Sequence, residues 1–185
     1  MARLAGPEVW RSADVQRTSG WRFELDPAGA EEVAAAARAA VAEISDPADV
    51  GRKQFRIPGV TNLCDRIHET LETGGGFAVI AGLPFDGLTY EEQVALTLGL
   101  SDHVGRVVPQ NYELQRIVDV RDEGIEYSHR SRGYRSNKHL PFHTDGAHLF
   151  SLTCLRVGAQ GGETIITSAS AVYNRMADEH PDALA

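Results

Sequence analysis

The stretch KHLPFHTDGAHLF, residues 138–150, decides which fold the rest of the chain can have. As a helix, it would place His139 and His143 four positions apart on one face, the spacing with which two helical histidines bind zinc in metalloproteases. Pro141 lies between them and would break that helix, and the glutamate that such a site needs is absent. As a strand, residues two apart share a face, so His143 and Asp145 project together. The sequence therefore favours a strand here.

The pair His143 and Asp145 offers an imidazole nitrogen and a carboxylate oxygen to one ion. These are two of the three ligands of a 2-His-1-carboxylate site, which holds non-haem Fe(II) with open positions for chemistry. Gly146 follows directly, and its backbone can turn without a side chain that crowds the ion. Three-residue matches are common by chance, so an ordinary surface histidine with a turn-capping aspartate stays open as an alternative.

Length, composition and net charge limit which classes of protein are possible. The chain has 185 residues, 42% of them hydrophobic and 24% charged, and a net charge of −8. This length suffices for one core, so we expect a single domain over residues 1–185. The negative charge disfavours nucleic acid and anionic membranes as partners. No apolar run has membrane-spanning length and the first fifteen residues lack a signal-peptide pattern, so the sequence predicts a cytoplasmic location.

Helix signals dominate the first part of the chain. Asp26 and Pro27 form a cap followed by a proline in the first turn, and an alanine-rich amphipathic run continues to about Ser45. TYEE, residues 89–92, is a capping box. Helices are therefore expected over residues 26–45, from Leu63 to the glycines at 74–76, from 89 to about 100, and over 169–180.

Strand signals dominate the second part. FAVIAGLP, residues 77–84, is a short apolar run ended by glycine and proline, which predicts a buried strand. Helices followed by a run of strands favour an α+β fold in which helices pack outside antiparallel sheets. The outer helical segment is expected at about 1–75. Further strands are expected at residues 105–110, 114–120, 139–145, 148–157 and 163–168.

The two cysteines, Cys64 and Cys154, are far apart in sequence, and no CxxC spacing occurs. Cys64 lies in a helix-like stretch and Cys154 in an apolar run. Both are interpreted as core residues rather than as metal ligands or a disulfide.

Several motifs occur together along the chain: GPEVWRSADV and GWRFEL near the N-terminus, then GGGFAVIAGLP, LGLSDHVGRVVPQN, LPFHTDGAH and GGETIITSASAVYNRM. In this order they resemble the TauD/TfdA family of Fe(II)- and 2-oxoglutarate-dependent dioxygenases, within the clavaminate synthase-like superfamily. The resemblance covers essentially the whole chain. It implies a double-stranded β-helix (jelly roll) with flanking N-terminal helices, incomplete in this chain, whose barrel starts at about residue 76.

The resemblance also implies roles for individual residues. His143 and Asp145 would be the first histidine and the carboxylate of the iron site. Thr164 would bind a carboxylate of 2-oxoglutarate, and Gly161 and Gly162 would form the turn before it. A threonine chosen only for its strand propensity stays an alternative for Thr164.

The chemistry that the family implies uses Fe(II), 2-oxoglutarate as cosubstrate, and O2. Oxidative decarboxylation gives succinate and CO2 and drives hydroxylation, or a related oxidation, of a C–H bond in a small organic substrate. The protein holds the geometry and excludes water.

Two residues that the family needs, a distal histidine and an arginine for 2-oxoglutarate, cannot be placed by motif. His180 comes too early, at a helix end, and His148 lies an odd number of positions from Asp145, although the turn at Gly146 could override that. The sequence therefore predicts the N-terminal portion of a longer dioxygenase, with both residues beyond Ala185.

Residues that could contact the substrate flank His143 and Asp145, which we call the metal pair. Segments 107–120 and 134–141 are expected to line or cover the entrance, with Gln110, Asn137 and His139 as candidates.

Two other functions stay open. The same HxD pair could serve a zinc hydrolase or a cupin-like isomerase, and the chain could be a truncated, inactive remnant of a dioxygenase. Dependence of turnover on 2-oxoglutarate would separate the first alternative from the oxygenase.

Overall fold

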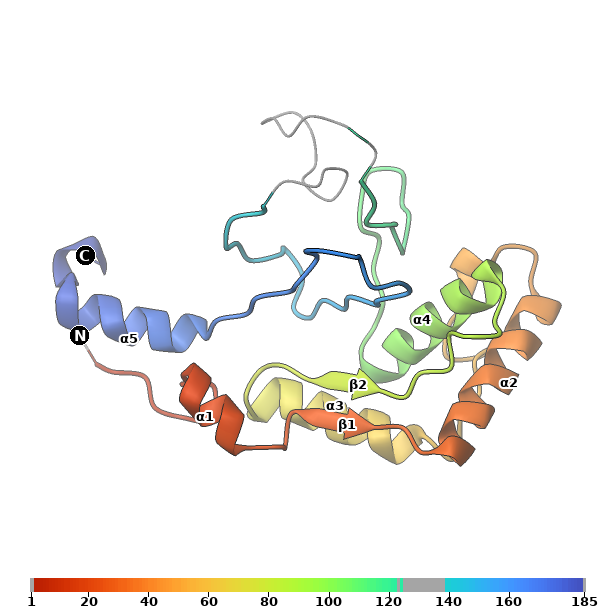
Figure 1. Cartoon of the computed structure of the whole chain (residues 1–185), viewed down its shortest axis with the longest axis horizontal. Coiled ribbons are helices and arrows are strands. Elements are labelled where there is room, and N and C mark those ends of the chain that lie inside the picture. Colours follow the sequence, from red (N-terminus) through yellow and green to blue (C-terminus); the bar gives the residue numbers. More distant parts are fainter. Residues whose placement is uncertain (1, 123, 125–138, 185) are drawn as a thin grey trace.

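The computed structural model describes residues 2–122, 124 and 139–184. Three helices form its packed part, and α2 and α3 both contact α4 (Figure 1). A pair of short parallel strands, β1 and β2, lies beside α3. We refer to these five elements as the helical layer: β1 (Arg22–Glu24), α2 (Pro27–Glu43), α3 (Thr61–Thr73), β2 (Val79–Ala81) and α4 (Tyr90–Val104).

Side-chain caps fix where two of these helices begin. The carboxylate of Asp26 accepts a hydrogen bond of 2.7 Å from the backbone N–H of Gly29 at the start of α2. At α4, the backbone N–H of Glu92 donates to Thr89, and the Glu92 carboxylate accepts from the backbone N–H of Thr89. Each of these bonds satisfies an amide that has no partner within the helix. The expected cap at Asp26 and the expected capping box are confirmed.

The core of the helical layer is apolar and tightly packed. Phe55 is fully buried among residues of α2, α3 and α4. Gly99 on α4 has no side chain, and a Cβ placed there would overlap the ring of Phe55. The core therefore requires glycine at position 99. Its most deeply buried members include Val33, Ala37, Ala40, Val50, Ile57, Cys64, Ala95 and Leu96.

The N-terminal segment ties the last long helix to the rest of the chain. The Asn174 side chain, nearly buried on α5 (Ala169–Glu179), bonds both the N–H and the C=O of Leu4 at 2.8 and 2.9 Å. Trp10 donates to the carbonyl of Gly75 at 2.8 Å and stacks against Phe77. Figure 1 shows α5 beside the N-terminus, away from the helical layer. The other short elements are α1 (Ser12–Arg17), η1 (Pro47–Asp49) and η3 (Pro181–Leu184).

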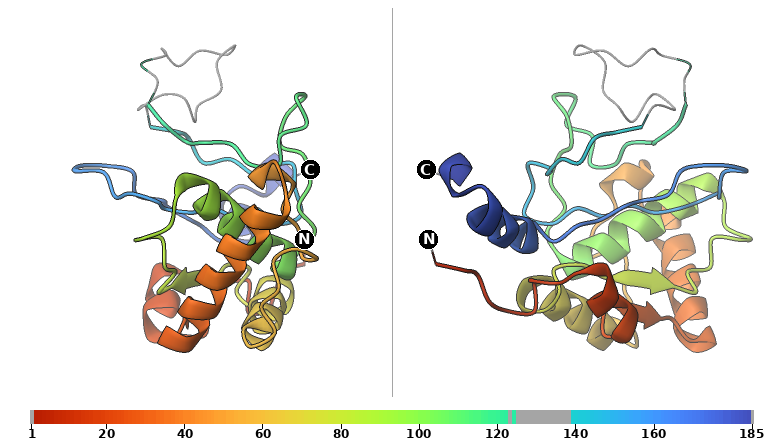
Figure 2. Two further views of the ribbon diagram at one scale, coloured as in Figure 1. Left: turned by 90° about the vertical axis from the view of Figure 1, so that its right-hand side faces the viewer. Right: turned by 60° about the vertical axis from the view of Figure 1, so that its left-hand side comes forward.

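The four expected helices and the strand within residues 77–84 are confirmed, although Val79 of that strand is 41% exposed. The other five expected strands are not: among the described residues of 105–168, the chain forms no helix or strand (Figure 2). The described sheet is also parallel and two-stranded rather than antiparallel. The jelly roll is therefore not seen in the described ranges.

The physical reason lies in the environment of the apolar side chains. Phe142, Phe150, Val157 and Ile165 are between 62% and 88% exposed. A strand needs a neighbouring strand for its backbone groups and a packed face for its side chains. Within the described part of the chain, these segments have neither.

Cys64 is buried, as expected, but Cys154 is exposed, so its interpretation as a core residue is wrong. Its segment, residues 148–157, was expected to be a packed strand; it forms no strand here, and its apolar residues Phe150, Leu152 and Val157 are exposed. None of the described helices combines the length and the hydropathy that crossing a bilayer requires.

Candidate metal site

His143 and Asp145 lie close together on the protein surface. Nε2 of His143 is 3.9 Å from Oδ1 of Asp145, and each side chain is about half exposed, at 52% and 51%. The two side chains thus converge, as the spacing of two residues predicts for extended backbone. No regular strand forms around them.

A backbone carbonyl sets the tautomer of His143. Its Nδ1 is 2.9 Å from the carbonyl oxygen of Pro141. A carbonyl only accepts hydrogen bonds, so Nδ1 carries the proton and Nε2 keeps its lone pair. Metal-binding histidines have this arrangement, in which the second ring nitrogen donates to a carbonyl or carboxylate. The sequence indicated Pro141 only as a helix breaker, and its role as the orienting acceptor was missed.

The donor set fits a divalent cation. Two ligand bonds of about 2.1 Å at the roughly 90° angle of a facial triad would place the two atoms about 3 Å apart, so the pair has to close from 3.9 Å to bind one ion in that geometry. An imidazole nitrogen with a carboxylate oxygen is the combination that non-haem iron sites use. Within residues 2–122, 124 and 139–184, no group of three His, Cys, Asp or Glu side chains is arranged to hold a metal ion. The described residues thus bring together two candidate ligands, His143 and Asp145.

The other histidines have different partners. Nε2 of His148 is 2.8 Å from the Glu72 carboxylate on α3, and His180 is the C-terminal cap of α5. Nδ1 of His68 bonds the carbonyl of Val104 at 2.8 Å, and Nε2 of His103 bonds the carbonyl of Phe55 at 2.7 Å. The last two therefore bond backbone carbonyls from their positions on helices α3 and α4 of the helical layer.

Thr164 is exposed and follows a tight turn. Gly161 and Gly162 have φ values of +75° and +81°, a left-handed conformation that glycine adopts without strain. The glycine pair thus turns the chain as expected, while the strand expected after it does not form. The role of Thr164 towards 2-oxoglutarate stays a prediction.

The candidate substrate contacts also stay predictions. Gln110 bonds within its own loop: its side chain donates to the carbonyl of Val108 at 2.9 Å. His139 is exposed, and Asn137 lies outside the described residues.

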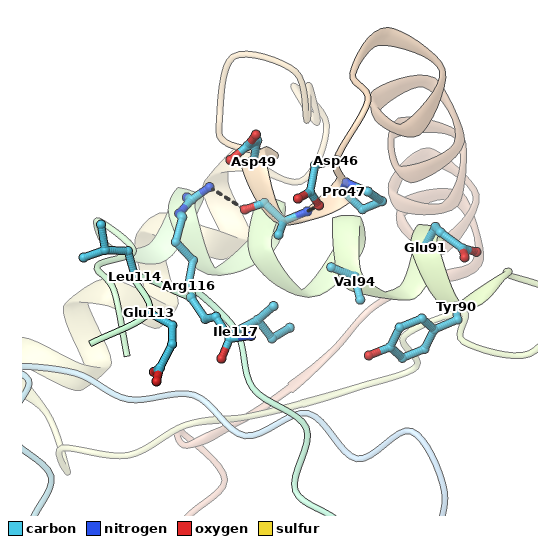
Figure 3. A pocket seen from close by; sticks show the side chains of 12 residues that line it. Asp46, Pro47, Asp49, Tyr90, Glu91, Val94, Glu113, Leu114, Arg116 and Ile117 are labelled. Atoms are coloured by element: carbon cyan, nitrogen blue, oxygen red, sulfur yellow. Dashed lines mark hydrogen bonds between the residues drawn. The ribbon is translucent and has the colours of Figure 1, made fainter. Parts of the chain in front are cut away.

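An open cavity of about 440 Å³ lies elsewhere, between η1, the start of α4 and residues 113–117 (Figure 3). The Arg116 guanidinium there donates to the carbonyls of Ala48 and Val50. Tyr90 donates to the Asp119 carboxylate at 2.9 Å, and burial together with this bond raises the pKa of the Tyr90 hydroxyl. The polar groups of Arg116 and Tyr90 thus already have partners, and neither His143 nor Asp145 lines the cavity.

The converging imidazole and carboxylate of His143 and Asp145 are the donor types that non-haem metalloenzymes use. The family described as "Taurine catabolism dioxygenase TauD, TfdA family" matches residues 41–185. The chain belongs to this dioxygenase family, and the family resemblance stated from the motifs is confirmed.

Two relatives extend the comparison. The chain is similar to FR-33289 synthase of Streptomyces rubellomurinus (strain ATCC 31215), with 33% identity over 183 residues, 98% of this chain and 54% of the relative. It is also similar to the taurine hydroxylase-like protein SAT17 of Stachybotrys chartarum (strain CBS 109288 / IBT 7711), with 31% identity over 136 residues, 69% of this chain and 34% of that protein. The chain therefore spans about half the length of the first relative and about a third of the second.

Proposed function

We propose that this chain supplies two of the three iron ligands of an Fe(II)- and 2-oxoglutarate-dependent oxygenase that oxidises a C–H bond of a small organic substrate. The observation that supports it is the convergence of His143 and Asp145, with the His143 proton held on Nδ1 by Pro141. Membership of the dioxygenase family supports the same chemistry.

The roles of the residues follow from their chemistry. Nε2 of His143 and the Asp145 carboxylate bind the ion, and Pro141 keeps the imidazole in the tautomer that binding requires. The Thr164 hydroxyl donates to a carboxylate of 2-oxoglutarate. When bound, Fe(II) and 2-oxoglutarate would activate O2, which is the oxidant: 2-oxoglutarate would supply two of the four electrons that O2 accepts, on decarboxylation to succinate and CO2, and the substrate C–H bond the other two.

The proposal includes a distal histidine and an arginine that the described residues do not provide. We expect both in sequence that corresponds to the part of the relatives outside the matched region. An arginine binds the distal carboxylate of 2-oxoglutarate well, because its planar guanidinium donates two parallel hydrogen bonds.

Succinate formation from 2-oxoglutarate, with Fe(II) and ascorbate, tests the proposal. We expect no turnover by residues 1–185 alone, and turnover by a protein in which the reading frame continues to the distal histidine and arginine. In that longer protein His143→Ala lowers succinate formation at least about 100-fold, whereas His180→Ala, at the end of α5, leaves it unchanged.

Two outcomes would refute the proposal. Robust turnover by residues 1–185 alone would show that no further ligands are needed. Turnover of substrate without 2-oxoglutarate would instead favour a hydrolase or an isomerase that uses the same pair.

A further inference from the structure

The segment that follows the metal pair is joined to the helical layer by two side-chain hydrogen bonds. Nε2 of His148 lies 2.8 Å from Oε1 of Glu72 on α3. Ser151 shares a hydrogen bond of 3.1 Å with Ser101 on α4. Between them, a methyl of Leu149 lies near Gly105 at the end of α4, 3.4 Å from the position that a Cβ on this glycine would occupy. We call residues 148–151 the docking segment.

Within the described part of the chain, neither His143 nor Asp145 forms a hydrogen bond or ion pair with the helical layer. His143 bonds the carbonyl of Pro141 in its own segment and lies near Asp145, whose described partner is His143 alone. The placement of the His143–Asp145 pair therefore depends on the contacts that His148 and Ser151 make with the helical layer. Asp145 precedes His148 by three residues, so their Cα atoms are at most about 11 Å apart. If the His148 contact is lost, a change in backbone position there can move Asp145, because only residues 146 and 147 lie between the two.

The Glu72–His148 contact is an oriented hydrogen bond, and it is an ion pair as well when the His148 ring is protonated. A carboxylate only accepts, so Nε2 of His148 donates its proton to Glu72 in either charge state of the ring. Glu72 is better shielded than His148, since 33% of its side chain is exposed against 81% for the histidine. A partly exposed pair of this kind changes an equilibrium by up to about five-fold.

On this evidence we propose that Glu72 is a positioning residue that, through His148, holds the His143–Asp145 pair in place against the ends of α3 and α4. The proposal rests on the proposed function, because it assumes that this pair binds a divalent metal. It also gives His148 a role other than that of the third iron ligand, since its Nε2 is used in the bond to Glu72.

Two readouts on residues 1–185 test the proposal: the affinity for Mn(II), measured by electron paramagnetic resonance of the free ion, and hydrogen exchange of the amides of residues 142–149 without metal. Glu72→Gln and His148→Ala are each expected to weaken Mn(II) binding about three- to five-fold and to speed exchange by about two- to five-fold. The double variant is no weaker than either single one, because both remove the same contact.

Two matched controls accompany these variants. Glu69→Gln changes the carboxylate one turn earlier on α3, which has no side-chain partner among the described residues, and leaves both readouts unchanged. His148→Lys keeps a donor for Glu72 and retains most of the Mn(II) affinity. Far-UV circular dichroism checks that every variant keeps the helices.

Each result supports or overturns the proposal. Unchanged Mn(II) affinity in Glu72→Gln and His148→Ala, with wild-type binding that His143→Ala abolishes, overturns the positioning role alone. Loss of binding in His148→Lys as complete as in His143→Ala makes His148 a ligand and overturns it as well. If the wild-type chain binds Mn(II) no better than His143→Ala, the proposed function fails and the positioning role fails with it.

Discussion

Phe55 and Phe142 are the same side chain in two regions of one molecule with opposite environments. Phe55 has no exposed surface, whereas 67% of Phe142 is exposed. Val33 and Val157 repeat the contrast, at 0% and 88%. The helical layer thus buries its apolar residues within the described chain, while the region that carries the metal pair does not.

The difference follows from what each kind of element needs. A helix satisfies its backbone internally and needs only a neighbouring apolar face, which α2, α3 and α4 give one another. A strand depends on partners for both backbone and side chains. The helical layer can therefore form a core by itself, and the docking segment is the place where it supports the metal pair.

The largest expected effect is the loss of stability when the buried Phe55, rather than the exposed Phe142, is replaced by alanine. Phe55→Ala leaves a cavity in a packed core and is expected to lower the free energy of unfolding by about 3–5 kcal/mol. Phe142→Ala is expected to change it by less than about 0.5 kcal/mol, because the ring is already in water. Urea unfolding followed by circular dichroism measures both. Similar losses in the two variants would show that Phe142 is packed, contrary to this account.

The two cysteines should show the same contrast in the reactivity of their thiols. Burial, and then the nearby Asp65 carboxylate, raise the pKa of the Cys64 thiol to about 11, whereas Cys154 is exposed. Because the thiolate is the reactive form, Cys64 should react with a thiol reagent at pH 8 at least about 100-fold more slowly than Cys154.

Labelling of Cys154→Ser and Cys64→Ala with Ellman's reagent assigns the two rates. In urea the difference should disappear. Equal fast rates without urea would mean that the helical layer opens readily.

A smaller effect is expected at α5, which is helical but lies apart from the core. Asn174→Ala removes both bonds to Leu4, and we expect a local loss of about 2 kcal/mol. Hydrogen exchange in α5 should become about 10- to 30-fold faster, while the urea midpoint of the helical layer stays the same.

Arg175→Ala is the matched control for Asn174→Ala, because it removes only an exposed ion pair with Glu179. Such a pair contributes about 0.3–0.5 kcal/mol. A shift of the whole unfolding transition in Asn174→Ala would mean that α5 unfolds together with the core.

Local patterns predicted the helices well, because a cap such as Asp26 or the Thr89–Glu92 box acts over three residues. The same patterns missed β1, which is only three residues long, and overstated the strands, whose formation depends on partners far along the chain.

Within the site, the spacing of His143 and Asp145 predicted their convergence. The Glu72–His148 contact joins residues 76 positions apart and leaves no local signal in the sequence. The carbonyl of Pro141 lies two residues before His143 and could have been considered.

The proposed function depends on His143 and Asp145 binding one divalent metal ion together. Anaerobic titration of residues 1–185 with Fe(II) tests it most directly, in the wild type, His143→Ala, Asp145→Ala and the double variant. We expect weak binding at one site, lowered at least about ten-fold in each single variant and little further in the double variant, because both remove the same site. Fe(II) affinity that is unchanged in either single variant would contradict it.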